Sequence, residues 1–438
     1  MGRRRRVSYI DEGGKLGLAY SHFDSLYGVP IRFATQPGEE QEAPRLSLSQ
    51  DRFDAMAEVN PDGGFIDQVR LRWGYADYSH FELGEDGAIG TSFFNKGQEA
   101  RLELAQATRG PWSGATGAQY VFRDFNVVGD EAFLPKNSTF RFGLFTVQQL
   151  ELGAVKLEAG GRFDHARVSS SPTAEQSQFF DGERTFDAFS GSLGSSYEFA
   201  GEWKVGLNLS RTSRAPSAEE LFANGPHAGT EAFEIGNPDF AIERATSAEA
   251  ILRGKGEGYS IEASAYYSWF SNYIYEAQTS EIEDGLPVYQ GQQGDAKYYG
   301  FEIQGELTLA DLGEAEITTD LLADYTHARI DGYGPAPRIP PFRTLAGLGL
   351  NSSSIDARAE VEWVAKQSDT APLETPTSSY TMVNAEVTWR PWGEERPLSL
   401  ALAANNIFDV DARRASSFLK DYAPLAGRDI RLSVRLNF

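Results

Sequence analysis

The end of the chain has the most regular alternation of apolar and polar residues. Residues 428–438 read R-D-I-R-L-S-V-R-L-N-F, and from Leu432 onward every second side chain is apolar. A period of two predicts a β-strand with one apolar face. Such a strand suits a soluble sandwich, where the apolar face covers a core. It suits equally a membrane barrel, with lipid outside and water inside.

The same alternation predicts about 18 strands of roughly 9–18 residues, close to the length of a tilted membrane-spanning strand. It predicts no amphipathic helix long enough to anchor a soluble α/β fold. The predicted fold class is therefore all-β. The predicted strands cover residues 15–23, 51–59, 65–81, 94–105, 114–125, 139–150, 155–168, 185–198, 203–211, 246–254, 259–275, 298–309, 314–328, 342–350, 355–365, 380–389, 398–408 and 428–438.

The predicted connections alternate between short and long, and this pattern separates the two architectures. An up-and-down barrel has short turns at one end and long loops at the other, whereas a sandwich has no reason to sort its loops in this way. The pattern favours an antiparallel up-and-down transmembrane β-barrel. Short connections lie near residues 61–64, 109–113, 151–154, 199–202, 255–258, 310–313, 351–354 and 391–397, and long ones near 24–50, 126–137, 169–182, 212–245, 276–296, 329–341, 367–379 and 409–427.

The amino-acid composition argues against several classes of protein. The 438 residues include 63 Asp and Glu against 40 Lys and Arg, a formal net charge of −23, which argues against nucleic acid as a partner. There is no cysteine, so no disulfide or thiol chemistry is expected. We find no apolar run of about 18 residues and hence predict no transmembrane helix. A barrel strand, however, shows lipid only at every second residue.

The start of the chain, M-G-R-R-R-R, is charged but is not followed by the apolar core of a secretory signal. One interpretation is a cytosolic protein. We favour a chain that begins partway through a longer one.

Three motifs, in this order, resemble those of TonB-dependent outer-membrane receptors. The first is R-A-P followed by E-L-F and then G-N-P, in the segment from Ser210 onward. The second is N-N-x-F-D before the last long loop, and the third is a terminal aromatic residue. The residues that carry the three motifs are Arg214, Pro216, Glu220, Leu221, Phe222, Gly236, Asn237, Pro238, Asn405, Asn406, Phe408 and Phe438.

A narrower likeness is to the zinc-uptake branch of these receptors. It is carried by residues 123–125 with 129–135, by the loop 225–227, which reads G-P-H, and by residues 416–421, which read S-S-F-L-K-D. The resemblance implies that zinc is a transported ligand and that the protein holds no cofactor.

The family resemblance implies one barrel domain over residues 1–438. Family barrels have about 22 strands and enclose an N-terminal plug domain. Here no plug precedes the barrel, no energy-coupling TonB box is visible, and about four strands are unaccounted for. We therefore expect an N-terminally truncated barrel without its plug domain.

A zinc site needs His, Cys, Asp or Glu side chains that converge in space. His227 is the best candidate because it lies in the longest outer loop with Glu231 and Glu234 nearby. The alternative is a solvated loop histidine.

Other titratable residues also lie near the predicted outer strand ends. A shared metal-capture surface there would involve His22, His80 and His327, or these are ordinary rim residues. Acidic outer loops concentrate cations or simply keep the loops solvated. The acidic residues are Glu39, Glu40, Glu42, Asp130, Glu131, Glu281, Glu283 and Asp284.

The expected function is TonB-dependent uptake of a scarce nutrient, such as zinc or a metal chelate, across the bacterial outer membrane. The expected partners are outer-membrane lipid, the small ligand, and the TonB energy-coupling complex if a plug is present. We find no hydrolase elbow, phosphate loop or spaced cysteines and expect no enzyme activity. The alternatives are a passive pore, a non-transporting barrel used as an adhesin, and a soluble β protein.

Overall fold

The computed structural model describes residues 2–28, 45–61, 63–84, 86–129, 132–227, 230–393 and 398–436. Several residues of the sequence analysis lie outside these ranges. They are the terminal aromatic Phe438 and the acidic residues Glu39, Glu40, Glu42, Asp130 and Glu131.

The described residues form a 22-stranded sheet with one short helix, α1. Each predicted strand overlaps a strand of the structure, which confirms the all-β prediction. The strands are β1 Gly2–Asp11, β2 Gly14–Gly28, β3 Arg45–Val59, β4 Ile66–Leu83, β5 Ile89–Gln106, β6 Trp112–Gly129, β7 Asn137–Leu152, β8 Val155–Ser170, β9 Gly182–Ala200, β10 Trp203–Arg214, β11 Asn224–His227, β12 Ala232–Ile235, β13 Glu243–Gly256, β14 Tyr259–Glu283, β15 Leu286–Asp311, β16 Ala315–Ile330, β17 Gly334–Pro335, β18 Arg343–Ser352, β19 Ile355–Val364, β20 Tyr380–Trp389, β21 Leu398–Asn405 and β22 Asp429–Leu436, and α1 is Ala218–Phe222.

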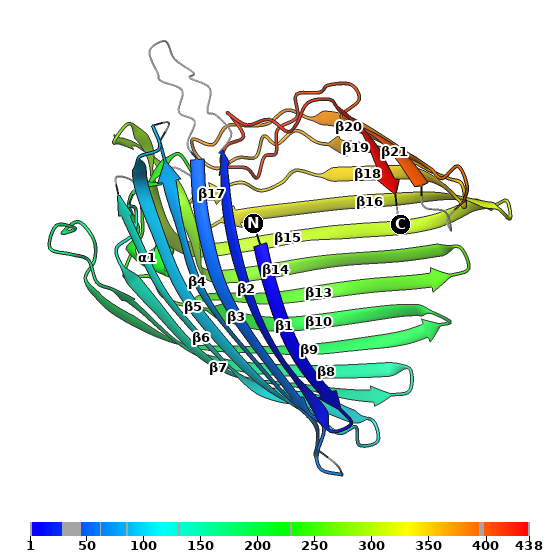
Figure 1. The fold of residues 1–438 in the computed structure, drawn as a ribbon, viewed down its shortest axis with the longest axis horizontal. Coiled ribbons are helices and arrows are strands. Elements are labelled where there is room, and N and C mark those ends of the chain that lie inside the picture. The colour runs from blue at the N-terminus through cyan, green and yellow to red at the C-terminus, as the bar shows by residue number, and fades with distance from the viewer. Residues whose placement is uncertain are drawn as a thin grey trace. The chain divides into compact units, whose positions relative to one another are not determined.

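The chain forms two compact units, which are described separately. In the first, β1 to β8 pair in sequence order, each antiparallel to the next, and Figure 1 shows them running from dark blue to cyan. In the second, β15, β16, β18, β19, β20, β21 and β22 pair in that order, again antiparallel. The first unit consists of Met1–Gly194, Ser210–Thr246 and Phe270–Asp295, and the second of Ser195–Leu209, Ser247–Trp269 and Ala296–Phe438.

The predicted count of about 18 strands is too low. Three of the additional strands, β11, β12 and β17, are two to four residues long and lie within long connections. The fourth is β1, which pairs with β2 over its whole length. Four consecutive arginines hide the alternation of β1, because they place charges on both faces of the strand.

One predicted long loop is also wrong. Residues 276–296 are mostly strand, since β14 continues to Glu283 and β15 begins at Leu286. Asp284 and Gly285 form the turn with φ of 51° and 78°, the left-handed pair that joins antiparallel strands with their natural twist. Polar side chains on both faces of these strand ends remove the alternation on which the prediction relied.

The sheet of the first unit has two chemically different faces. Across β1 to β7, one row of neighbours on the apolar face is Val7, Leu18, Ala55, Trp73, Ala100, Tyr120 and Phe142. The next row, on the polar face, is Arg6, Ala19, Asp54, Gly74, Glu99, Val121 and Arg141. The alternation read from the sequence is therefore the alternation of the two faces.

The apolar face is not covered by other parts of the described chain. Val7 is 75% exposed and Leu18 54%. In the second unit the apolar residues of β22 are exposed by 60% or more. A soluble sandwich would bury these side chains, and soluble monomers rarely expose apolar patches of this extent. Lipid is the covering that fits a strand with one apolar and one polar face.

No helix among the described residues has the length and apolarity needed to cross a membrane.

The main protein core of the first unit lies around α1. Leu221 and Phe222 of the helix are 0% and 2% exposed, and the helix contacts the ends of β7 and β8. The buried members of this core are Phe125, Val127, Phe133, Leu134, Ala166, Val168, Phe186, Ala218, Leu221, Phe222, Ala223, Phe240 and Ile274. The residues of the E-L-F motif therefore hold a loop in place against strand ends.

Candidate functional site

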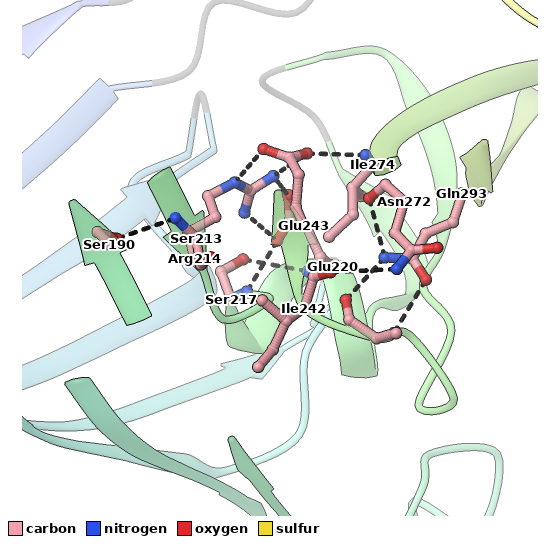
Figure 2. Close-up of polar contacts among 11 residues, drawn as sticks. Ser190, Ser213, Arg214, Ser217, Glu220, Ile242, Glu243, Asn272, Ile274 and Gln293 are labelled. Carbon is pink, nitrogen blue, oxygen red and sulfur yellow. Dashed lines mark hydrogen bonds and ion pairs between the residues drawn. The ribbon is translucent and has the colours of Figure 1, made fainter. Parts of the chain in front are cut away.

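Arg214, the last residue of β10, is the centre of the R-A-P motif. Its guanidinium donates two hydrogen bonds of 2.8 Å to the two carboxylate oxygens of Glu220. It donates two more, of 2.8 and 3.1 Å, to Glu243 at the start of β13. Figure 2 shows the arginine between the two acids. One side chain thus joins the end of one strand, the following helix and the start of the next strand.

Helix α1 begins with a capping box that the sequence shows as S-A-E-E. The Ser217 hydroxyl accepts a hydrogen bond of 3.2 Å from the Glu220 amide, and the Glu220 carboxylate accepts one of 2.8 Å from the Ser217 amide. Pro216, which precedes the cap, is fully buried. The spacing of Ser217 and Glu220 is a helix-start signal that can be read from the sequence, although the alternation of apolar and polar residues does not reveal it.

A second arginine ties α1 to the sheet. The Arg123 guanidinium of β6 donates a hydrogen bond of 2.8 Å to Glu219. Burial works to raise the pKa of Glu219, but the hydrogen bond and charge of Arg123 outweigh it and leave that pKa below its ordinary value. Arg123 belongs to the R-D-F stretch that suggested the zinc-uptake branch. In the structure it contacts α1.

The G-N-P motif lies against the end of α1. The Gly236 amide donates to the Ala223 carbonyl over 2.8 Å, and the Asn237 amide donates to the Glu220 carbonyl over 2.9 Å. A Cβ atom on Gly236 would lie 2.7 Å from the same Glu220 carbonyl oxygen, so glycine is required by close approach of two backbones. The side-chain oxygen of Asn237 accepts a hydrogen bond of 2.9 Å from the Asp239 amide. This bond spans Pro238, as is typical of a turn.

The same segment is hydrogen-bonded to the middle of β14. The Ile274 amide donates to the Glu243 carboxylate over 2.8 Å, and the Asn272 side chain donates to the Ile242 carbonyl over 3.2 Å. Gln293 of β15 exchanges two hydrogen bonds with the backbone of residue 241 (Figure 2). These hydrogen bonds therefore hold the motif segment against β14 and β15.

The N-N-x-F-D motif has a similar role in the second unit. Asn406 is 1% exposed, has a φ of 47°, and exchanges hydrogen bonds of 2.8 and 2.9 Å with the backbone of Val410. It follows Asn405, the last residue of β21. Phe408 is 70% exposed. This motif turns the chain out of β21 into its last long connection.

The structure brings His227 and Glu234 together. These residues lie on the paired strands β11 and β12, and the His227 Nδ1 atom is 2.9 Å from Glu234 Oε1. The Thr230 hydroxyl donates to the same oxygen over 2.7 Å, and the Phe133 ring stacks on the imidazole with centroids 4.2 Å apart. Glu231 lies in the turn between the strands with a φ of 53°. Within the described ranges, no cluster of three or more His, Asp or Glu side chains has metal-binding geometry.

The other histidines of the sequence analysis have separate surroundings. His22 lies between Asp24 and Asp51, at 2.6 and 2.9 Å. His80 stacks on Phe93 with centroids 4.2 Å apart. His327 has its Nδ1 atom 3.8 Å from Asp369. Each has its own local partner.

The ionisation of His227 gives a testable consequence. Burial lowers the pKa of His227, but the hydrogen bond and charge of Glu234, with the charges of Glu82 and Glu276, outweigh burial and raise that pKa above 6.5. The charged imidazole therefore stabilises the β11–β12 pair fully below pH 6.5, and this stabilisation is lost as the pH rises through the raised pKa. We expect an NMR titration of the ring to show a pKa above 6.5 in the wild type and a lower one in Glu234→Gln. An unchanged value in Glu234→Gln would contradict this assignment.

Comparison with known proteins agrees with the fold. The profile of the family described as TonB dependent receptor-like, beta-barrel, matches residues 2–407. Three similar solved structures are the copper transporter OprC, the FrpB iron transporter from Neisseria meningitidis, and the ferric yersiniabactin uptake receptor FyuA from Yersinia pestis. Their identities to this chain are 15%, 13% and 14% and their TM-scores 0.81, 0.76 and 0.71. Each match covers 100% of this chain, and 74%, 71% and 71% of the other chain.

These similarities show the fold and the family, and the zinc-uptake branch stays a prediction. Members of the family are transport receptors of the bacterial outer membrane. This chain is therefore a bacterial outer-membrane protein. The matched residues include the R-A-P, E-L-F, G-N-P and N-N motifs. The chain belongs to the family of TonB-dependent receptor-like β-barrels.

Proposed function

We propose that residues 1–438 form a single barrel domain that serves as the outer-membrane pathway of a TonB-dependent uptake receptor for a scarce nutrient. The observation that carries this proposal is the two-faced sheet, with exposed apolar side chains on one face and charged ones on the other. In a barrel, the apolar face contacts lipid and the polar face lines a water-filled interior. The TonB protein supplies the energy through a plug domain, as it does for this family.

The proposed ligand is a metal ion or a metal chelate. The solved structures that resemble this chain are named for copper, iron and ferric yersiniabactin, which supports this class. Zinc is the specific candidate, with His227 as the first protein ligand. The carboxylate of Glu234 beside Nδ1 is the usual outer-shell partner of a metal-binding imidazole, because it orients the ring and leaves Nε2 to the metal. Glu231 is next to this pair along the chain.

The test is zinc uptake by cells under zinc limitation, with the receptor expressed from its complete gene. We expect uptake to require the TonB protein and to fall about tenfold or more in His227→Ala, because loss of a ligand costs at least as much as loss of an outer-shell partner. The matched control is His165→Ala, a strand histidine that pairs with Asp187. Uptake that does not require TonB would show that the protein is a passive pore and not a receptor of this kind. TonB-dependent uptake that is equal in both variants would remove His227 from the site.

A further inference from the structure

Two short turns at the same end of the first unit bring a positive charge and two aromatic rings together. The turn between β3 and β4 carries Phe65, and the turn between β5 and β6 carries Arg109 and leads into Trp112. The Phe65 and Trp112 rings have centroids 5.8 Å apart, and the Arg109 guanidinium lies 5.1 Å from the Phe65 centroid. We call Phe65, Arg109 and Trp112 the turn cluster.

The backbone of the second turn is fixed by hydrogen bonds. The amides of Arg109 and Trp112 donate to each other's carbonyls over 2.8 and 3.2 Å, so only Gly110 and Pro111 lie between them. Gly110 has a φ of 60°, a conformation that favours glycine in a two-residue turn. The Trp112 indole nitrogen donates a further hydrogen bond of 2.8 Å to the Gln148 side chain. The fold therefore sets where Arg109 and Trp112 lie relative to the sheet.

Trp112 continues the apolar face of the first unit as far as this turn. It lies eight residues before Tyr120 on β6, and side chains an even number of residues apart share one face of a strand. Its cross-strand neighbour is Leu150 on β7, and the neighbour of Leu150 is Leu157 on β8. Trp112 and Leu157 are both exposed. The turn cluster therefore borders the face that fits a covering of lipid.

The charge of Arg109 has no acidic partner in the protein. Arg109 is exposed and forms no ion pair with any carboxylate of the described residues. The Phe65 ring attracts the guanidinium through its electron-rich face. It also covers one side of the cation, and electrostatic attraction is stronger where water is excluded. The cluster thus presents a positive charge at the border of the apolar face.

We propose that the turn cluster is a binding site for the phosphate group of a phospholipid in the periplasmic leaflet of the outer membrane, with Arg109 as its anchor. Short turns of outer-membrane barrels lie on the periplasmic side, and aromatic residues mark the level of the head groups. The Arg109 guanidinium matches a phosphate because it donates two parallel, charge-assisted hydrogen bonds. Trp112 and Leu150 contact the acyl chains. This inference goes beyond the proposed function, because it concerns the face toward lipid and not the pathway of uptake.

The test is native mass spectrometry of the full chain in non-ionic detergent micelles. The chain is titrated with dioleoylphosphatidylglycerol and with dioleoylglycerol, which has the same acyl chains and no phosphate. We expect the phospholipid to bind about tenfold more tightly, and Arg109→Gln to remove most of this difference. Arg109→Lys should keep part of it, since the charge remains and the planar fork is lost. Phe65→Leu should weaken phospholipid binding about two- to fivefold through loss of the cation–π contact.

The matched control is Arg253→Gln. It makes the same change in charge beside the short turn between β13 and β14, but Arg253 pairs with Glu262, so this variant should bind like the wild type. Equal binding of the two lipids, by a chain whose heat-modifiable gel mobility shows a folded barrel, would overturn the proposal. So would equal weakening in Arg109→Gln and Arg253→Gln, since this reports net charge and not a site. Lipid binding to the purified chain does not involve uptake, so a passive pore would leave this result unchanged.

Discussion

Phe222→Ala is expected to release the loop segment around α1 from the sheet. Phe222 is 2% exposed and stacks on Phe180 with ring centroids 5.4 Å apart. Deleting a buried phenylalanine ring costs about 3–5 kcal/mol, through lost transfer free energy and the cavity that remains. The cost falls on the segment that the ring anchors, so local opening should increase. Hydrogen exchange of the amides of residues 217–236 should accelerate by about two to three orders of magnitude.

The matched control is Phe408→Ala. Phe408 also belongs to a family motif, but its side chain is 70% exposed, so its removal should change stability by about 0.5 kcal/mol or less. The strands β2 to β4 should keep their exchange protection in both variants, because none of their residues belongs to the α1 core. Equal exchange in the two variants would show that Phe222 does not anchor this segment.

Arg214→Ala is expected to have the second largest effect. The substitution removes four hydrogen bonds, two of them to Glu243. The Glu243 side chain is only 11% exposed. Within this network its carboxylate would then keep one hydrogen bond, from the Ile274 amide. Leaving a buried carboxylate unpaired is costly. Because Arg214 itself is 45% exposed, solvent screens part of the loss. We therefore expect about 2–3 kcal/mol, near the lower end for broken buried ion pairs.

Limited proteolysis measures this cost, because cleavage follows the population of the opened segment when opening is fast. The cleavage rate within residues 212–245 should rise by about 30- to 150-fold. Arg253→Ala is the control, since Arg253 and Glu262 form an exposed pair with 60% and 39% of their side chains accessible, and such a pair contributes no more than about 1 kcal/mol. In the double variant Arg214→Ala with Glu243→Gln, part of the loss should be recovered. Additive losses would mean that the two side chains act independently.

These expectations give the family motifs a physical meaning. Arg214, Glu220, Gly236 and Asn406 hold strand ends and loops in fixed positions, through buried hydrogen bonds and close backbone contact. His227, the proposed zinc ligand, lies on β11, which directly follows the α1 segment that these motifs hold. A motif substitution should therefore change loop stability first and ligand affinity only as a consequence.

Sequence alone determined the all-β fold and the position of most strands, because a period of two is a local property that each strand displays by itself. The period of two failed to predict β1, because charged residues occupy both faces of that strand. It also failed at the ends of β14 and β15, because polar residues occupy both faces there. The motifs identified the family because their order and spacing are also local. None of these features required knowledge of which strands are neighbours.

Only the tertiary structure decided which residues meet. His227 and Glu234 are close in sequence, and their pairing follows from the short β11–β12 connection. Arg141 and Ser213 are far apart in sequence, and their shared cavity depends on strand register and on where α1 holds the preceding segment. The sequence places arginines along many strands, but only the register aligns Arg6 and Arg141 in one row on one face. Such alignment is a property of the whole ladder, because a shift of one residue in any strand would move its side chains to the other face.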